Sequence, residues 1–208
     1  MDLSPEEVRV LACLMEKQVT TPDQYPLSLN ALVLACNQST NREPVVHYSD
    51  AIVDASLGSL RQRGLTRVVH SPSNRVPKHR HVAADVLGLQ DTEQAVLAVM
   101  MLRGPQTPGE LKSRAERMHA FADLAAVEDT LERLASRDEA LVVRLGRRPG
   151  QKETRFAQLL GGPVTDTDRD TDGDDEAPPR TRLDRVGELE TRVEALEAEM
   201  RRLRELFD

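Results

Sequence analysis

The stretch YPLSLNALVLACNQSTNREPVV, residues 25–46, joins an apolar helical segment to a polar turn. Ser28 is placed to cap a helix that runs to about Asn37, with Leu, Val and Cys side chains on one face. Asn, Gln, Ser and Thr follow, and Asn and Ser in particular favour turns because their side chains bond the nearby backbone. The stretch therefore predicts the turn of a helix-turn-helix.

The flanking residues predict two more helices and a hairpin. Ser4-Pro5-Glu6-Glu7 is a capping box with proline at the first helical position, and it predicts a helix over about residues 5–18. Ser49 predicts a further helix that ends near Gly64. We expect residues 65–70 to form a strand, residues 71–81 a basic loop and residues 81–87 a returning strand. The apolar side chains expected in the core are Val8, Leu11, Leu14, Met15, Leu29, Leu32, Val33, Cys36, Ile52, Val53, Leu57 and Leu60.

The same order of elements recurs between residues 91 and 160. One helix begins at Asp91, a capping box at Thr107 starts a second, and Asp123 caps a third, with Val127, Leu131 and Leu134 facing inward. A strand, a basic loop and a strand follow over residues 140–160. Three helices and a two-stranded hairpin, occurring twice, predict tandem winged-helix domains over residues 1–88 and 89–161. The expected fold class is mainly α with small β-hairpins (α+β).

The net charge of −7 arises near the C-terminus. Residues 1–90 carry 9 Lys+Arg and 9 Asp+Glu, and residues 91–160 carry 11 of each. Residues 161–180 carry 2 against 7. Residues 162–180 have no apolar periodicity, which predicts an acidic disordered linker. Because the preceding residues are neutral overall, the acidic pI does not exclude a nucleic-acid partner.

Residues 181–208 predict a dimerising coiled coil. Apolar residues occur at alternating steps of three and four up to Phe207, and valine at a with leucine at d favours a two-stranded parallel coil. Three e–g pairs have opposite charges in that register. The expected dimerisation residues are Val186, Leu189, Val193, Leu196, Met200 and Leu203. The alternative to a parallel homodimer is one amphipathic helix that folds back on the body.

Composition and spacing argue against several other classes of protein. Cys13 and Cys36 fall in apolar helical patterns, which predicts buried thiols without a disulfide framework. The longest apolar run, residues 95–102, is too short to span a bilayer, and no signal-peptide pattern is present, so we expect a cytoplasmic protein without membrane contact. His79 and His81 lack a third metal ligand, and no nucleophile motif or phosphate loop is recognisable. We expect no cofactor, no metal and no enzymatic activity.

Two basic hairpin loops and the polar turn supply the candidate contacts to duplex DNA. In a winged helix the third helix enters the major groove and the hairpin tip reaches the backbone or minor groove. The candidates are Gln38, Asn41, Arg42, Arg75, Lys78, His79, Arg80, Arg144, Arg147, Arg148 and Lys152. Asn37 and Asn41 have structural roles available in a turn, whereas none is evident for Gln38 and Arg42.

The charge of the predicted third helices opposes this interpretation. They carry Asp50, Asp54, Glu128, Asp129 and Glu132, which phosphates repel. A winged-helix scaffold for protein–protein contacts, without DNA binding, is therefore the alternative.

A resemblance to a known family agrees with the fold inferred from the pattern. Residues 21–45, TPDQYPLSLNALVLACNQSTNREPV, resemble the signature of the bacterial YceH family. The resemblance extends through GLTRVV (64–69), KHRHVA (78–83) and RGPQTPGELKSRAERM (103–118), and covers most of residues 4–160. It implies a cytosolic protein with tandem winged helices, and a coiled-coil tail also occurs among the relatives. It brings no activity, cofactor or catalytic residue.

Overall fold

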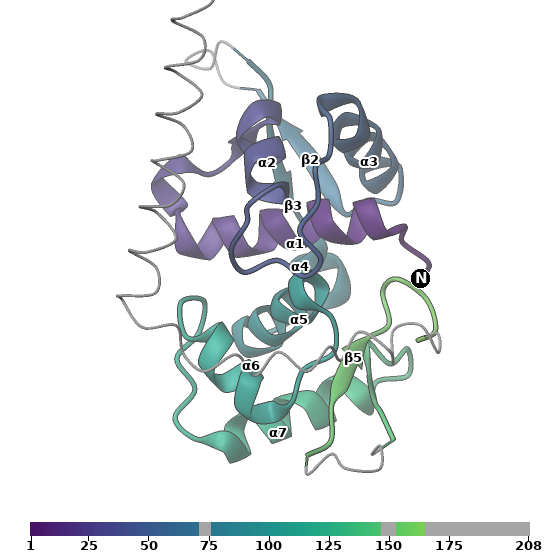
Figure 1. Ribbon diagram of the computed structural model, residues 1–208. Helices are drawn as coiled ribbons and strands as arrows, with labels where there is room; N and C mark the ends of the chain where they lie inside the picture. The colour runs from purple at the N-terminus through teal and green to yellow at the C-terminus, as the bar shows by residue number, and fades with distance from the viewer. Residues whose placement is uncertain (71–75, 147–152, 165–208) are drawn as a thin grey trace, which may run out of the picture. The chain divides into compact units, whose positions relative to one another are not determined.

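The structure is a computed structural model, and it describes residues 1–70, 76–146 and 153–164 (Figure 1). All of the described residues belong to one compact unit. The predicted coiled coil, and all of the predicted linker after residue 164, lie outside the described residues.

The first repeat places a short strand between its first two helices and a hairpin after its third. Its elements are α1 (Pro5–Thr20), the 3-10 turn η1 (Pro22–Gln24), β1 (Leu27–Ser28), α2 (Leu29–Cys36), α3 (Asp50–Gln62), β2 (Thr66–Val69), β3 (Lys78–His81) and α4 (Ala83–Leu87). The three strands form one antiparallel sheet in the order β1-β3-β2. The returning strand of the hairpin therefore lies in the middle of the sheet.

The second repeat has the same order of three helices followed by a hairpin. They are α5 (Asp91–Arg103), α6 (Pro108–Ala115), α7 (Leu124–Ala135), β4 (Val142–Arg144) and β5 (Phe156–Gln158). Gln106, between α5 and α6, forms a bridge with Phe156 of β5, in the place where β1 pairs with β3 in the first repeat. The predicted class, helices with small antiparallel sheets, is confirmed.

Most helices begin where side-chain caps were predicted. In α1, Ser4 Oγ accepts from Glu7 N at 3.2 Å while Glu7 Oε2 accepts from Ser4 N at 2.7 Å. Thr107 and Glu110 form the same reciprocal pair at α6. The caps satisfy backbone N–H groups that have no partner within the helix. The further predicted N-caps that accept as expected are Ser28, Ser49 and Asp123.

One hydrophobic core runs through both repeats. Helix α1 packs against α5, with α2 and α3 on one side of this pair and α6 and α7 on the other (Figure 1). Two backbone hydrogen bonds also join the repeats, from Glu43 N to Leu102 O at 2.8 Å and from Leu3 N to Leu160 O at 2.9 Å. The repeats are therefore one packed body. No helix in the described parts of the chain is long and apolar enough to cross a membrane.

Two local predictions are wrong. Ile52 was expected in the core but is 40% exposed, because Val53 occupies the inward position of the first turn of α3. The returning strand was expected over residues 81–87, but it is formed by Lys78–His81, and residues 83–87 form α4. The strand was missed because its inward side chains are histidines, which do not produce an apolar alternation.

Candidate functional site

The polar turn, residues 37–48, is closed by its own side chains. Asn37 Nδ2 donates to Tyr48 O at 2.9 Å, and Tyr48 N donates to Asn37 Oδ1 at 2.8 Å. Arg9 of α1 reaches the same turn, because its Nη1 donates to Cys36 O at 3.2 Å and its Nη2 to Pro44 O at 2.7 Å. Three chain segments are thereby fixed to one another.

Arg42 is buried inside this turn and does not face solvent. It is 4% exposed, and it forms a bidentate ion pair with Glu16 of α1, with distances of 3.2 Å from Nη1 to Oε1 and 2.6 Å from Nη2 to Oε2. Its Nε and Nη2 also donate to Ala35 O, at 3.1 and 3.0 Å. A guanidinium with its donors used inside the protein has none to offer a phosphate or a base. Arg42 therefore leaves our set of candidate DNA contacts.

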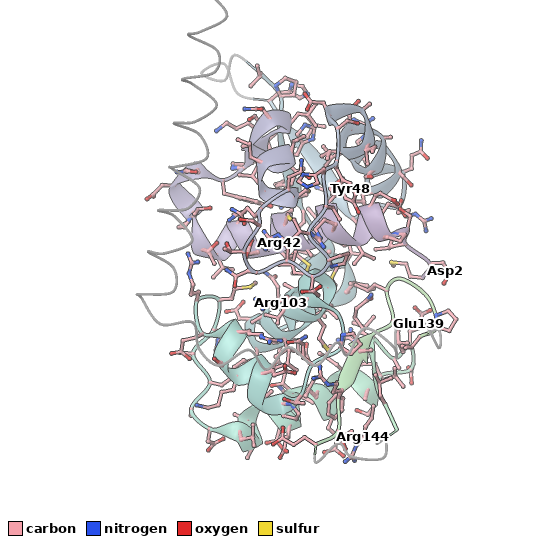
Figure 2. The ribbon with its side chains drawn as sticks, viewed as in Figure 1. Asp2, Arg42, Tyr48, Arg103, Glu139 and Arg144 are labelled. Carbon is pink, nitrogen blue, oxygen red and sulfur yellow. The ribbon has the colours of Figure 1, made fainter. Side chains whose placement is uncertain are left out.

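Gln38 and Asn41 are also engaged within the protein. Gln38 Oε1 accepts from Arg42 Nη2 at 2.9 Å and from Lys17 Nζ at 3.4 Å. Asn41 has a φ of 59°, in the left-handed region that asparagine tolerates, and its Oδ1 accepts from Arg103 Nη1 of α5 at 2.9 Å. Figure 2 shows Arg42 and Arg103 on neighbouring parts of the two repeats. The polar turn is thus a joint between the repeats.

The β2–β3 hairpin has two faces of different chemistry. Its register pairs Thr66 with His81, Arg67 with Arg80, Val68 with His79, and Val69 with Lys78. Since side chains alternate across a strand, these pairs fall into two sets. One set is Thr66, Val68, His79 and His81, which are buried or half-buried, and the other is Arg67, Val69, Lys78 and Arg80, which are half-buried or exposed. We call the second set the cationic face.

Arg67 and Arg80 lie directly opposite each other on the cationic face. Like charges in this position destabilise a sheet. Both side chains are exposed, and among the described residues no ion pair joins either of them, or Lys78, to a carboxylate. Two exposed arginines and the half-buried Lys78 therefore gather three positive charges on one face of the hairpin.

His79 and His81 lie on the other face of the hairpin. His81 is 3% exposed, its backbone N donates to Tyr25 Oη at 2.8 Å, and its Nε2 lies 2.5 Å from Gln18 Oε1. Burial lowers the pKa of His81 to about 4, and Arg80 adds to the effect, so the ring is neutral near pH 7. No group of three or more His, Cys, Asp or Glu side chains could hold a metal ion in the described parts of the chain. His79 is half-buried on the same face and also leaves our set of candidate DNA contacts.

The second hairpin contributes one described candidate. Arg144 is exposed at the end of β4, with its Nη2 3.5 Å from Thr154 Oγ1. Figure 2 shows it at the far end of the second repeat, well separated from Arg42. The structure therefore does not bring Arg144 together with the polar turn. The other predicted contacts, Arg75, Arg147, Arg148 and Lys152, lie outside the described residues.

The third helix of each repeat has an acidic exposed face. Asp50 and Asp54 are exposed on α3, beside the exposed Ile52. On α7 the exposed side chains include Leu124 and three acids, Glu128, Asp129 and Glu132. Burial lowers the pKa of His79. Two residues of α3 also act on it: Asp54 opposes the lowering and Arg61 adds to it. Helix α3 thus adjoins the hairpin on the face that carries Thr66 and His79, opposite the cationic face.

Sequence reasoning missed Arg9 and Arg67. Arg9 falls at a helix position that reads as polar, and its role depends on a turn that lies 27 to 35 residues later in the chain. Arg67 could have been found from its alternation with Thr66 and Val68 in the predicted strand. Its pairing with Arg80 depended on a hairpin register that the sequence does not specify.

These observations define the class of the protein. It is a mainly helical chain with two similar repeats, each of which contains a small antiparallel sheet. A family model described as "Protein of unknown function, DUF480" matches residues 3–151. A UPF0502 protein of Pelobacter propionicus is 48% identical over 211 residues, which cover 100% of this chain and 96% of the relative. The UPF0502 proteins YceH of Salmonella typhimurium and Salmonella agona are each 46% identical over 212 residues, with 100% and 95% covered. The chain belongs to this DUF480 family of UPF0502 (YceH) proteins, as its signature predicted.

Proposed function

We propose that this protein binds duplex DNA as a tandem winged helix. The order helix, short pairing segment, helix, helix and hairpin, found in both repeats, supports the winged-helix assignment. In this fold the hairpin, or wing, contacts the DNA backbone or minor groove. Because one fold serves many functions, the proposal rests on the side chains of the wing.

The cationic face of the β2–β3 hairpin is the observation that carries the proposal. Arg67, Lys78 and Arg80 project from neighbouring strands of one sheet, and two of them are directly opposed. Their mutual repulsion would be relieved by an anionic partner, and phosphates along a duplex present closely spaced negative charges. Contacts of this kind dominate non-specific affinity for DNA.

We also propose that the protein is a cytoplasmic, parallel homodimer held through residues 181–208. The heptad of Val186 to Phe207 supports this part of the proposal. In light scattering on the full chain, Leu189→Asp with Leu196→Asp should give a monomer. Thr191→Asp with Ala195→Asp adds the same charges outside the seam and should leave the dimer intact. A monomeric wild-type chain contradicts this assignment.

The alternative function, a scaffold for protein–protein contacts, is favoured by the exposed faces of α3 and α7. They combine carboxylates with the exposed aliphatic side chains of Ile52 and Leu124. Such a surface suits a basic, partly apolar protein partner better than it suits phosphates. This function requires no DNA binding, so one experiment separates the two.

The test is a titration of the full-length protein into fluorescent random-sequence duplex DNA at about 50 and 200 mM salt. Wild-type binding should weaken steeply with salt, and Arg67→Ala with Arg80→Ala should reduce the slope of log K against log salt by about 2. Arg117→Ala, at an exposed arginine on the turn after α6, is the matched control and should leave both affinity and slope unchanged. No wild-type binding at the lower salt contradicts DNA binding and favours the scaffold.

A further inference from the structure

The exposed side of α3 lacks side chains suited to base readout. In a winged helix the N-terminal residues of the third helix contact base edges. In the first two turns of α3, the exposed side chains are Asp50, Ala51, Ile52, Asp54 and Ala55. Guanine N7 and O6, adenine N7 and thymine O4 are acceptors, so a carboxylate offers them nothing, and only cytosine N4–H₂ and adenine N6–H₂ could donate to it. The donors Arg61 and Gln62 come only at the C-terminal end of the helix.

Electrostatics further opposes insertion of α3 between two phosphate backbones. Asp50 and Asp54 would approach phosphates of the same sign. Asp50 also stands in the first turn, where its charge offsets the positive end of the helix dipole. The N-terminus of α3 is therefore not an attractive position for a phosphate.

The predicted base readers of the polar turn before α3 are engaged within the protein. Gln38 and Arg42 are bound to each other, Arg42 is bound to Glu16, and Asn41 Oδ1 accepts from Arg103. Freeing Arg42 would break its ion pair with Glu16 in the first repeat, and freeing Asn41 would break its contact with Arg103 of the second repeat. Arg42 is thus withdrawn from the surface, and the amide oxygens of Gln38 and Asn41 are already bound within the protein.

The cationic face offers the opposite chemistry. Lys78 and Arg80 are two residues apart on β3, about 7 Å along the strand, and Arg67 faces Arg80 across a gap of about 5 Å. This gives a compact row of three long, flexible cations on the face of the hairpin opposite His79 and Thr66, the residues that adjoin α3. Such a row fits phosphates, which are common to every sequence and carry no base identity.

On the basis of the DNA binding proposed above, we propose that the protein grips duplex DNA by its phosphates through the cationic face, while α3 stays outside the major groove. Binding then depends on charge and discriminates little between base sequences. The acidic face of α3 repels phosphates, which disfavours entry of α3 into the major groove.

The test combines sequence competition with a major-groove probe on the full-length protein. Unlabelled duplexes of unrelated sequence should compete within a few-fold of one another, far below the roughly thousandfold or greater preference of a sequence-specific protein. Dimethyl sulfate should methylate guanine N7 equally in free and bound DNA, because that atom lies in the major groove. Asp50→Asn with Asp54→Asn should keep both results and bind DNA as tightly as wild type or a few-fold more tightly.

Each contrary outcome has a distinct meaning. Protection of guanine N7, or a selected site bound roughly a thousandfold more tightly than random duplex, overturns the inference while leaving DNA binding intact. Duplex RNA that competes better than DNA of the same sequence also overturns it, since the partner is then an A-form helix. No binding to any duplex is the failure of DNA binding itself. Circular dichroism of each variant checks that it is folded.

Discussion

Arg9 and Arg42 explain why a turn that resembles a binding loop is a structural joint. Each is 4% exposed, and each donates to backbone carbonyls in or next to the polar turn. The motif ACNQSTNREP, residues 35–44, supplies the carbonyls of Ala35, Cys36 and Pro44, and the side chains that complete the network. The motif is therefore accounted for by folding, without a ligand.

The ion pair of Arg42 with Glu16 should contribute measurably to stability. Glu16→Gln keeps the shape of the side chain but leaves the buried guanidinium without a countercharge. We expect a loss of roughly 2 to 4 kcal/mol in the free energy of unfolding, because an unpaired buried charge is costly. Urea denaturation followed by circular dichroism measures the change. Glu139→Gln, at an exposed glutamate, is the control, and equal midpoints for the two variants contradict the structural role.

His81 should make stability depend on pH. Burial lowers its pKa from 6.5 to about 4, so between these values the unfolded chain binds more protons than the folded one. The stability contributed by the neutral ring is fully present above pH 6.5 and falls as the pH drops towards 4, by about 3 kcal/mol in all.

Urea midpoints measured between pH 4 and 7.5 test the contribution of His81. His81→Gln should flatten the pH profile relative to wild type, whereas His70→Gln, at an exposed histidine, should leave it unchanged. The carboxylates titrate in all three proteins, so the difference between the profiles isolates one imidazole. Parallel profiles for wild type and His81→Gln would show that the ring is not kept neutral by burial.

At the scale of elements, helices were predictable and the hairpin register was not. Helix starts followed from Ser4, Ser28, Ser49, Thr107 and Asp123, since a cap and the following apolar period are both local signals. The strand Lys78–His81 was missed because its buried positions hold histidines. The set of candidate DNA contacts changed as a result. Arg80 and Lys78 stay in the set, and Arg67 joins them through a register that depends on tertiary packing.

Removing one of the two opposed arginines of the β2–β3 hairpin should raise the stability of the protein and lower its affinity for DNA. Arg67→Thr removes one of two like charges and introduces a residue that favours strands, so the free energy of unfolding should rise by up to about 0.5 kcal/mol. Affinity for random duplex DNA should fall, because the proposed DNA binding would lose one phosphate contact. Thermal denaturation and fluorescence titration give the two values.

A matched control for Arg67→Thr lies on the same face of the same strand. Val69→Thr, opposite Lys78, keeps all three cations and should leave DNA affinity unchanged. A lower stability of Arg67→Thr together with unchanged affinity would mean that Arg67 serves packing and has no part in binding.

At the scale of the whole molecule, the shared core couples the two hairpin-bearing repeats. Buried side chains of both repeats form one cluster, and α1 packs against α5 at its centre. Polar contacts extend this packing, since Gln18 Oε1 of α1 lies near both His81 Nε2 of the first hairpin and Gln94 Nε2 of α5, at 2.5 and 3.4 Å. A disturbance in either repeat should therefore reach the other.

Leu97→Ala tests this coupling between the repeats. Leu97 of α5 is fully buried in the common core, and its truncation should lower the free energy of unfolding by about 2 to 5 kcal/mol. Because the repeats share that core, hydrogen exchange followed by mass spectrometry should show faster exchange in α3 of the first repeat as well as in α7 of the second. Leu34→Ala, at a leucine that is 64% exposed on α2, is the control and should change neither. Faster exchange confined to residues 91–158 would mean that the repeats unfold separately, and the second hairpin could then act on DNA without the first.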